Sequence, residues 1–322
     1  MINYPIKFHP ILQDKIWGGN KLKTILNKNT NRENVGESWE ISGVEGNISV
    51  VSNGTEAGKK IDDLIAEYKA ELVGNKIYEQ FGNDFPLLIK FIDARTDLSV
   101  QLHPNDELAK QRHNSFGKTE MWYIMQADEG SKLNIGFKKE LDKREYIDYL
   151  ESGKITEVLN FEEVKKGDSV FINTGKVHAI GGGILLAEIQ QTSDITYRIY
   201  DWDRVDSDGN SRELHTALAL DAIDFEKKDD YWLSYDKKTN TSSKIASCDY
   251  FTTNFLPVEG QLEKDYSNLD SFVVYMCVDG AAEISIGEHA EKIKKGESLL
   301  VPANTKKLQI KAQKAELLEV YI

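Results

Sequence analysis

Residues 165–178 read KKGDSVFINTGKVH, and residues 294–307 repeat the pattern as KKGESLLVPANTKK. Each copy begins with Lys-Lys-Gly, an acidic residue and a serine, and continues into three apolar residues and a second turn. A glycine turn, a short buried strand and another turn are typical of β-barrels, and repetition of such a unit indicates a barrel that is built twice. The sequence therefore predicts a mainly β protein with two similar barrel units.

Three short segments carry candidate metal ligands: QLHP at residues 101–104, KTEMW at 118–122 and GKVH at 175–178. Gln101 and His103 point the same way if their segment is extended, because strand residues two apart share a face. Glu120 begins an apolar run, and His178 closes a glycine-rich turn. Any one of them alone is more simply interpreted as a polar residue at a strand end, so the hypothesis depends on their combination.

Two histidines, a glutamate and a glutamine would form a mixed nitrogen and oxygen site for a borderline divalent cation such as Zn²⁺, with positions left open for substrate. The same set also suits Fe²⁺, so an iron-dependent dioxygenase is an alternative. The second copy differs, since Lys307 stands at the position of His178 and Asn304 at that of Gly175. A protonated lysine does not ligate a metal cation. We therefore expect the second copy to keep the barrel and to bind no metal.

The composition limits the classes of partner. The chain has 322 residues and a formal net charge of −13, from 40 basic and 53 acidic side chains. Nucleic acid and anionic membranes need basic surface, so neither is expected as a partner. An anionic small molecule would also need a locally positive site.

The two cysteines lack metal-ligand spacing, the N-terminal region lacks a signal-peptide pattern, and no apolar run approaches a membrane span, so we expect a reduced cytoplasmic setting.

Local patterns predict many strands and few helices. The expected strands are residues 4–12, 38–42, 98–103, 120–126, 132–137, 168–173, 184–190 and 195–202, with further short strands after residue 250. An apolar stripe predicts a helix over 61–81, Asn105 is expected to cap a short helix, and further helices are expected within 143–160 and 211–225. The polar segment 226–245 is the best linker candidate. This divides the chain into a first domain, 1–240, with helical insertions, and a second, 246–322.

The repeated segment resembles the second cupin motif: Gly167, Gly175 and His178 match it, whereas Asn173 stands where proline is usual. Six further motifs occur in a characteristic order: WGG at 17–19, GESWEIS at 36–42, PLLIK at 86–90, LSVQLHPND at 98–106, KTEMW at 118–122 and QTSDITYR at 191–198. Together they resemble the short bacterial form of the type I mannose-6-phosphate isomerases, of the cupin superfamily. The resemblance is specific from about residue 5 to 205 and looser to the C-terminus.

The resemblance implies two cupin-type (jelly-roll) β-barrels with short helical insertions, a catalytic first domain and a metal-free second one. It implies a metal-dependent aldose–ketose isomerase that interconverts mannose 6-phosphate and fructose 6-phosphate through a cis-enediol, with a small-molecule sugar phosphate as its partner. It assigns one divalent cation per chain, expected to be zinc. The implied ligands are Gln101, His103, Glu120 and His178.

Two cations are candidate catalytic residues. In an extended segment Lys118 points the same way as Glu120, which places its ammonium beside the metal. Arg198 taken alone is also explained by a structural ion pair, for example with Asp194, but the family pattern places it at the catalytic centre. Its planar fork suits a phosphate or a developing oxyanion. Long forms of the family carry histidine before the lysine, whereas Gly117 stands here, so no proton-transfer role carries over from that histidine.

Other polar residues are weaker candidates. Glu37, Glu40 and Glu188 are possible supporting or proton-handling groups, and Trp39 and Trp122 either line the pocket or pack in the core. The alternative functions are an isomerase of another sugar phosphate and a non-catalytic sugar-binding cupin. Retention of the whole ligand set and of the lysine–arginine pair favours an enzyme. The general base, the native metal and the oligomeric state are left open.

Overall fold

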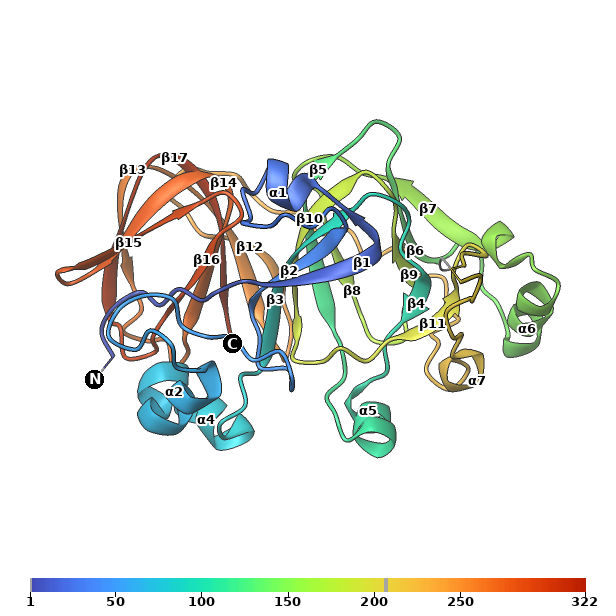
Figure 1. The fold of residues 1–322 in the computed structure, drawn as a ribbon, viewed down its shortest axis with the longest axis horizontal. Coiled ribbons are helices and arrows are strands. Elements are labelled where there is room, and N and C mark those ends of the chain that lie inside the picture. Colours follow the sequence, from blue (N-terminus) through green and yellow to red (C-terminus); the bar gives the residue numbers. More distant parts are fainter. Residues whose placement is uncertain (1, 206–207) are drawn as a thin grey trace.

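The computed structural model describes residues 2–205 and 208–322, which form three antiparallel sheets (Figure 1). The first sheet runs in the order β1 (Ile11–Gly19), β2 (Val35–Ile41), β3 (Leu87–Ala94), β10 (Ile184–Gln191), β5 (Glu120–Ala127) and β8 (Ser169–Ile172). The second runs in the order β11 (Tyr197–Tyr200), β4 (Val100–Leu102), β9 (His178–Ile180), β6 (Lys132–Phe137) and β7 (Leu159–Glu163).

The third sheet contains only C-terminal strands, drawn in orange and red in Figure 1. Its order is β12 (Ser243–Ser247), β13 (Thr252–Asp265), β17 (Lys307–Tyr321), β14 (Val273–Ile286) and β15 (His289–Lys294), and β16 (Ser298–Val301) pairs with β14. The mainly β prediction is confirmed. The strand orders of the described residues are open, however, so closed barrels are not seen: no ladder joins the edge strands β1 and β8 of the first sheet to each other or to those of the second.

The helices are short and peripheral. They are α1 (Lys21–Thr24), α2 (Ile61–Tyr68), α3 (Ala70–Val73), α4 (Asn75–Phe81), α5 (Asp106–His113), α6 (Lys143–Glu151), the 3₁₀ turn η1 (Ile155–Glu157) and α7 (Thr216–Ala219). The predicted cap of α5 is confirmed, because the Asn105 side chain accepts a hydrogen bond from the backbone N–H of Leu108 at 2.9 Å.

The apolar stripe over 61–81 is helical in three pieces and not in one. Lys69 and Gly74 both have positive φ, which ends the α-helical path. At Gly74 a β-carbon would lie 2.3 Å from the carbonyl oxygen of Asp270, so only glycine allows this approach to the C-terminal sheet. The backbone of α3 also binds that sheet, since Ala303 N–H donates to the carbonyl of Leu72. Tertiary packing therefore decides where the helix breaks.

Other boundaries also differ from the prediction. The strand expected over 4–12 begins only at Ile11, and the preceding residues form isolated bridges such as Ile6 to Leu300. The helical pattern over 143–160 stops early, because β7 begins at Leu159. The helix expected over 211–225 is limited to α7. Strands β3, β7, β9, β12 and β15 were missed. Strand β3 lacks apolar–polar alternation because it is buried on both faces, β9 has only three residues, and β12 begins within the segment predicted as a linker.

The first sheet lies between two apolar cores, which explains why β2, β3 and β10 are buried along their whole length. On one face, Tyr123 and Phe91 share a core with Phe255 and Phe272 of the third sheet. On the other face, Trp122 belongs to a core that also includes side chains of the second sheet. The candidate linker is not detached, because Tyr231 is buried and its carbonyl accepts a hydrogen bond from Phe171 of β8. The division at 240–246 stays a prediction.

Strand pairing supports the internal repeat. In the first copy β5 pairs with β8 and β10, and β10 pairs with β3; in the second, β14 pairs with β16 and β17, and β17 pairs with β13. Glu120 lies opposite Ile172, and Val273 lies opposite Val301 at the same point of the repeat. The second copy thus has Val273 at the position of Glu120. The counterpart of Glu188 is Glu319. Glu188 pairs with Trp122, two residues after Glu120, and Glu319 pairs with Tyr275, two residues after Val273.

Phe255 should be a main stability determinant of the shared core. Its ring is buried, with its centroid 5.9 Å from that of Tyr123 and 5.1 Å from that of Tyr235. We expect Phe255→Ala to lower the free energy of unfolding by about 3–5 kcal/mol. Chemical denaturation measures this, with Phe161→Ala as the control because that ring is 41% exposed. Equal losses in the two variants would contradict the shared core.

Candidate metal centre

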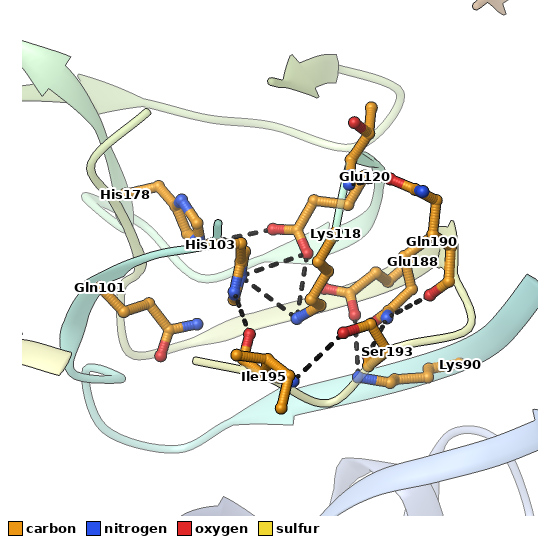
Figure 2. Close-up of polar contacts among 12 residues, drawn as sticks. Lys90, Gln101, His103, Lys118, Glu120, His178, Glu188, Gln190, Ser193 and Ile195 are labelled. Atoms are coloured by element: carbon orange, nitrogen blue, oxygen red, sulfur yellow. Dashed lines mark hydrogen bonds and ion pairs between the residues drawn. The ribbon is translucent and has the colours of Figure 1, made fainter. Parts of the chain in front are cut away.

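The predicted ligands meet between the first and second sheets (Figure 2). Gln101 lies on β4 directly opposite His178 on β9, and His103 follows β4 by one residue. Glu120 comes from the facing sheet, where it is the first residue of β5. Figure 2 shows the side chains of these residues converging on one space. Residues from three separate segments are therefore brought together as the sequence predicted.

Three of these residues form a compact buried triad. Nε2 of His103 lies 3.6 Å from Oε2 of Glu120, and Nε2 of His178 lies 3.4 Å from Oε1 of the same carboxylate. All the potential ligand atoms are within 4.8 Å of one another, and each side chain is 1% exposed. Ser99 donates a hydrogen bond to Oε1 of Gln101, whose amide extends toward His103.

Backbone carbonyls fix the tautomers of both histidines. Nδ1 of His103 donates to the carbonyl of Ile195, and Nδ1 of His178 donates to that of Lys176, each at 2.8 Å. Because a carbonyl can only accept, the protons are on Nδ1 and the lone pairs of Nε2 face Glu120. Nε2 of His178 and Oε1 of Glu120 have no hydrogen-bond partner among the described residues, whereas Oε2 of Glu120 has the Lys118 ammonium 3.2 Å away. Such buried, unpartnered acceptors fit a cation held between them.

Burial controls the charges of the triad. It lowers the pKa of His103 well below its usual value and that of His178 to about 4, so both imidazoles are neutral, the form that binds metals. Burial also raises the pKa of Glu120 to about 7, although the nearby Lys118 acts in the opposite direction. A carboxylate in this position needs positive charge beside it.

Lys118 supplies one positive charge. Its Nζ lies 3.2 Å from Nε2 of His103 and 3.2 Å from Oε2 of Glu120, and its side chain is buried (Figure 2). Lys118 and Glu120 therefore do point the same way, as the extended segment predicted. The ammonium lies at the edge of the triad, where it faces the neighbouring pocket.

A pocket of about 330 Å³ opens beside the triad. Its lining includes Gln101, His178 and an unusual number of cations. These are Lys15, Lys90, Lys118, Arg198 and Arg212. Three carboxylates, of Glu37, Glu188 and Asp194, line the same pocket, but the five cations leave its lining net positive in a chain that is acidic as a whole, which favours an anion.

Arg198 reaches this pocket from β11. Its Nη1 donates to the carbonyl of Glu213 at 2.8 Å, while its Nε is buried without a hydrogen-bond partner among the described residues. Burial and the nearby Arg212 lower its pKa. Among the described residues Arg198 forms no ion pair with Asp194, but its bond to the Glu213 carbonyl leaves a structural role as an alternative. Nε of Arg198 is left for a ligand, whereas Nε and Nη2 of Arg212 are bound to Asp201 at 2.7 and 2.5 Å.

Comparison with known proteins identifies the family. The phosphomannose isomerase type I catalytic domain matches residues 6–137, and the mannose-6-phosphate isomerase cupin domain matches residues 241–322. A mannose-6-phosphate isomerase of Streptococcus mutans is 34% identical over 95% of this chain and 94% of its own length. The chain belongs to the mannose-6-phosphate isomerase family. The family and the enzyme class inferred from the motifs are therefore confirmed.

A sequence relative and a solved structure from Bacillus subtilis extend the likeness. One mannose-6-phosphate isomerase is 34% identical over 94% of each chain. The crystal structure of a mannose 6-phosphate isomerase has a TM-score of 0.89 with this chain at 31% identity, and the match covers 99% of this chain and 100% of the other. Among the described residues, no helix combines the length and the apolar character needed to span a membrane.

Two pocket residues of this isomerase were missed from the sequence. Lys90 is buried on β3 with its Nζ 3.0 Å from Glu188 and 4.0 Å from Glu37. The signal was available, because a single lysine interrupts the apolar run LLIKFI at 87–92. Arg212 had no such signal: it lies in a loop, and its ion pair with Asp201 appears only in the folded chain.

The weaker candidates divide into two groups. Glu37 and Glu188 line the pocket, and each accepts a hydrogen bond from an indole, of Trp39 at 2.6 Å and of Trp122 at 2.9 Å. Both tryptophans are therefore buried and line the pocket at the same time. Glu40 faces the other way, where Lys28 binds it at 2.6 Å. A strand residue three positions from Glu37 lies on the opposite face, so Glu40 supports the fold and not the pocket.

Glu37 should make stability depend on pH. Burial alone would raise its pKa, but Lys90, Lys15 and Trp39 together lower it to about 2. A depressed folded-state pKa stabilises the protein above pH 4.5, and the contribution disappears as the pH falls toward 2. We expect Glu37→Gln to lower the free energy of unfolding by about 3 kcal/mol at pH 7, with little effect near pH 2.

Denaturant titration of the metal-free protein at several pH values measures this difference. Glu129→Gln is the matched control, because Glu129 is exposed. A Glu37→Gln effect of the same size at pH 3 and pH 7 would show that the stabilisation is not electrostatic.

Proposed function

We propose that the chain interconverts mannose 6-phosphate and fructose 6-phosphate as a metal-dependent aldose–ketose isomerase that works through a cis-enediol. The observation that carries the proposal is the buried triad of His103, Glu120 and His178, which opens onto a pocket rich in cations. A metal-binding triad beside a cationic pocket suits a substrate that has a carbonyl for the metal to polarise and a phosphate for the cations to bind. The mannose-6-phosphate isomerases of Streptococcus mutans and Bacillus subtilis, both 34% identical to this chain, support this substrate.

We assign the metal to Gln101, His103, Glu120 and His178, and we propose zinc as the ion. Two imidazole nitrogens, a carboxylate and an amide oxygen are a donor set for a borderline cation. When bound, such an ion polarises the sugar carbonyl and stabilises negative charge on the adjacent oxygens. The carbonyls of Ile195 and Lys176 hold the two histidines in the tautomer that this role needs.

Lys118 and Arg198 act on the substrate in this proposal. The Lys118 ammonium, next to His103 and Glu120, donates hydrogen bonds to the oxygens at C1 and C2. Arg198 offers a planar fork at another part of the pocket wall, where it binds either the phosphate or the developing enediolate, and Arg212, held by Asp201, adds positive charge nearby. Packing of Trp39 and Trp122 in the wall limits access of water.

Proton transfer between C2 and C1 requires a carboxylate or another base in the pocket. Glu37 and Glu188 are the candidates, because both line the pocket and are held by an indole N–H. Lys90 lies between them and lowers the pKa of each against the effect of burial, so both are carboxylates at neutral pH. A carboxylate can accept the C2 proton and return it to C1.

We further propose that both units are cupin-type jelly rolls and that the C-terminal one is metal-free. The matching strand order of the two copies supports the first point. Val273 and Lys307 stand where the first copy has Glu120 and His178, and Lys307 pairs instead with Glu263 at 3.1 Å. A reduced setting such as the cytoplasm is consistent with Cys248 and Cys277, which are both free.

A coupled assay tests the function directly. We expect turnover of mannose 6-phosphate and fructose 6-phosphate that chelation removes and Zn²⁺ restores. Turnover of a different sugar phosphate alone would replace the proposed substrate, and binding without turnover would identify a sugar-binding cupin instead.

Removal of a triad histidine should remove metal and activity together. In His178→Ala, one of the two Nε2 donors is lost, so we expect the zinc content to fall and kcat to decrease in proportion. Elemental analysis and the coupled assay measure the two quantities. His9→Ala is the control, since His9 is exposed. Full metal occupancy with normal turnover in His178→Ala would reject the assignment.

The variant Arg198→Lys keeps the positive charge but loses the planar guanidinium, which can donate two parallel hydrogen bonds. We expect kcat/KM to fall by roughly 10²-fold or more, with unchanged metal content and stability. A fall mainly in kcat indicates a role at the enediolate, and a rise mainly in KM indicates the phosphate. Arg32→Lys is the control, because Arg32 forms an exposed ion pair with Asp14. Wild-type kinetics in both Arg198→Lys and Arg198→Ala would leave Arg198 without a role.

A further inference from the structure

The position of Lys118 depends on a segment that has no regular structure of its own. Residues 114–119 connect α5 to β5 without helix or strand. The backbone N–H of Lys118 makes only a long hydrogen bond, 3.3 Å, to the carbonyl of Pro104. Something else must hold this segment, because a catalytic side chain displaced by about 1 Å can lose on the order of 10²-fold in rate.

Two side chains hold the peptide groups that flank Lys118. The N–H of Gly117 donates to Oδ1 of Asp106 at 2.8 Å, and the N–H of Thr119 donates to Oε1 of Gln191 at 2.8 Å. The two acceptors are joined, because Nε2 of Gln191 donates to Oδ1 of Asp106 at 3.0 Å. The segment is therefore fixed on both sides of Lys118 by one connected network.

The network extends into the C-terminal unit. The hydroxyl of Tyr250 donates to Oδ2 of Asp106 at 2.6 Å. Tyr250 lies between β12 and β13, within the region that matches the cupin domain, and is 144 residues from Asp106 along the chain. Burial and the Asp106 carboxylate raise the pKa of Tyr250, so the hydroxyl remains a donor at neutral pH.

Gly117 allows this arrangement. A β-carbon at this position would lie 2.7 Å from the backbone nitrogen of Asp106 and 2.9 Å from the carbonyl carbon of Asn105. The chain therefore packs directly against the start of α5, which leaves no room for a side chain. This gives a physical reason why glycine stands here, where the long forms of the family carry histidine.

We infer that Asp106 and Gln191 are positioning residues for Lys118, and that Tyr250 makes the C-terminal unit part of the support of the active site. The inference rests on the proposed role of Lys118. The second copy lacks a catalytic cluster of its own, yet in this arrangement its Tyr250 hydroxyl contributes to the catalytic rate.

Tyr250→Phe tests the inference by removing a single hydroxyl. We expect kcat to fall roughly 3- to 10-fold, as for loss of one buried hydrogen bond, with KM and zinc content unchanged. Asp106→Ala should lower kcat by roughly 10²-fold. Asp106→Asn should recover most of that loss, because its amide oxygen can still accept from Gly117 and Gln191.

The controls separate positioning from general stability. Tyr68→Phe removes a comparable tyrosine–carboxylate bond, the 3.0 Å hydrogen bond from Tyr68 at the end of α2 to Glu56, and should leave kcat unchanged. In a Lys118→Ala background, Tyr250→Phe should have no further effect on the residual rate, because the network acts through Lys118.

Wild-type kcat in Tyr250→Phe and Asp106→Ala would overturn the inference and leave the isomerase function intact. An equal loss in Tyr68→Phe, a loss that tracks zinc content, or the same Tyr250→Phe effect with and without Lys118 would also overturn it. Lack of isomerase activity in the wild-type protein would instead reject the proposed function.

Discussion

The burial of one carboxylate constrains the rest of this structure. Glu120 is 1% exposed; the Lys118 ammonium lies 3.2 Å from its Oε2, and its Oε1 has no hydrogen-bond donor among the described residues. A buried charge without compensation is strongly unfavourable, so positive charge must be placed beside it. Lys118 supplies part of it, and the lone pairs of His103 and His178 complete a site that a divalent cation would satisfy. Loss of that cation should therefore affect stability as well as catalysis.

The fold meets this constraint by dividing the site between two sheets. The histidines come from β9 and from the residue after β4 in the second sheet, and Glu120 comes from the first sheet, which is packed on both faces. In the C-terminal copy, by contrast, a buried glutamate has its charge balanced by side chains of the same unit. This copy keeps a glutamate, Glu319, at the position of Glu188, but Lys264 of the same unit neutralises it at 2.7 Å and Tyr266 hydrogen-bonds it. That polar cluster is satisfied internally, whereas the one around Glu120 is not.

The sequence could single out the residues that meet in the candidate metal site because their signals are local. Gln101 and His103 share a face by strand parity, and His178 follows a recognisable glycine turn. The sequence could not predict the breaks in 61–81, since the break at Gly74 depends on the approach of Asp270, nearly 200 residues away. Arg212 and Tyr250 were missed for the same reason. Their contacts, with Asp201 and Asp106 respectively, form only in the folded chain.

X-ray diffraction from crystals of the purified protein, recorded above and below the zinc absorption edge, examines the metal centre most directly. An anomalous peak should lie within bonding distance, about 2.0–2.2 Å, of Nε2 of His103, Nε2 of His178 and an oxygen of Glu120. Protein that is fully active and shows no anomalous peak for any metal between these three side chains would contradict the proposed centre.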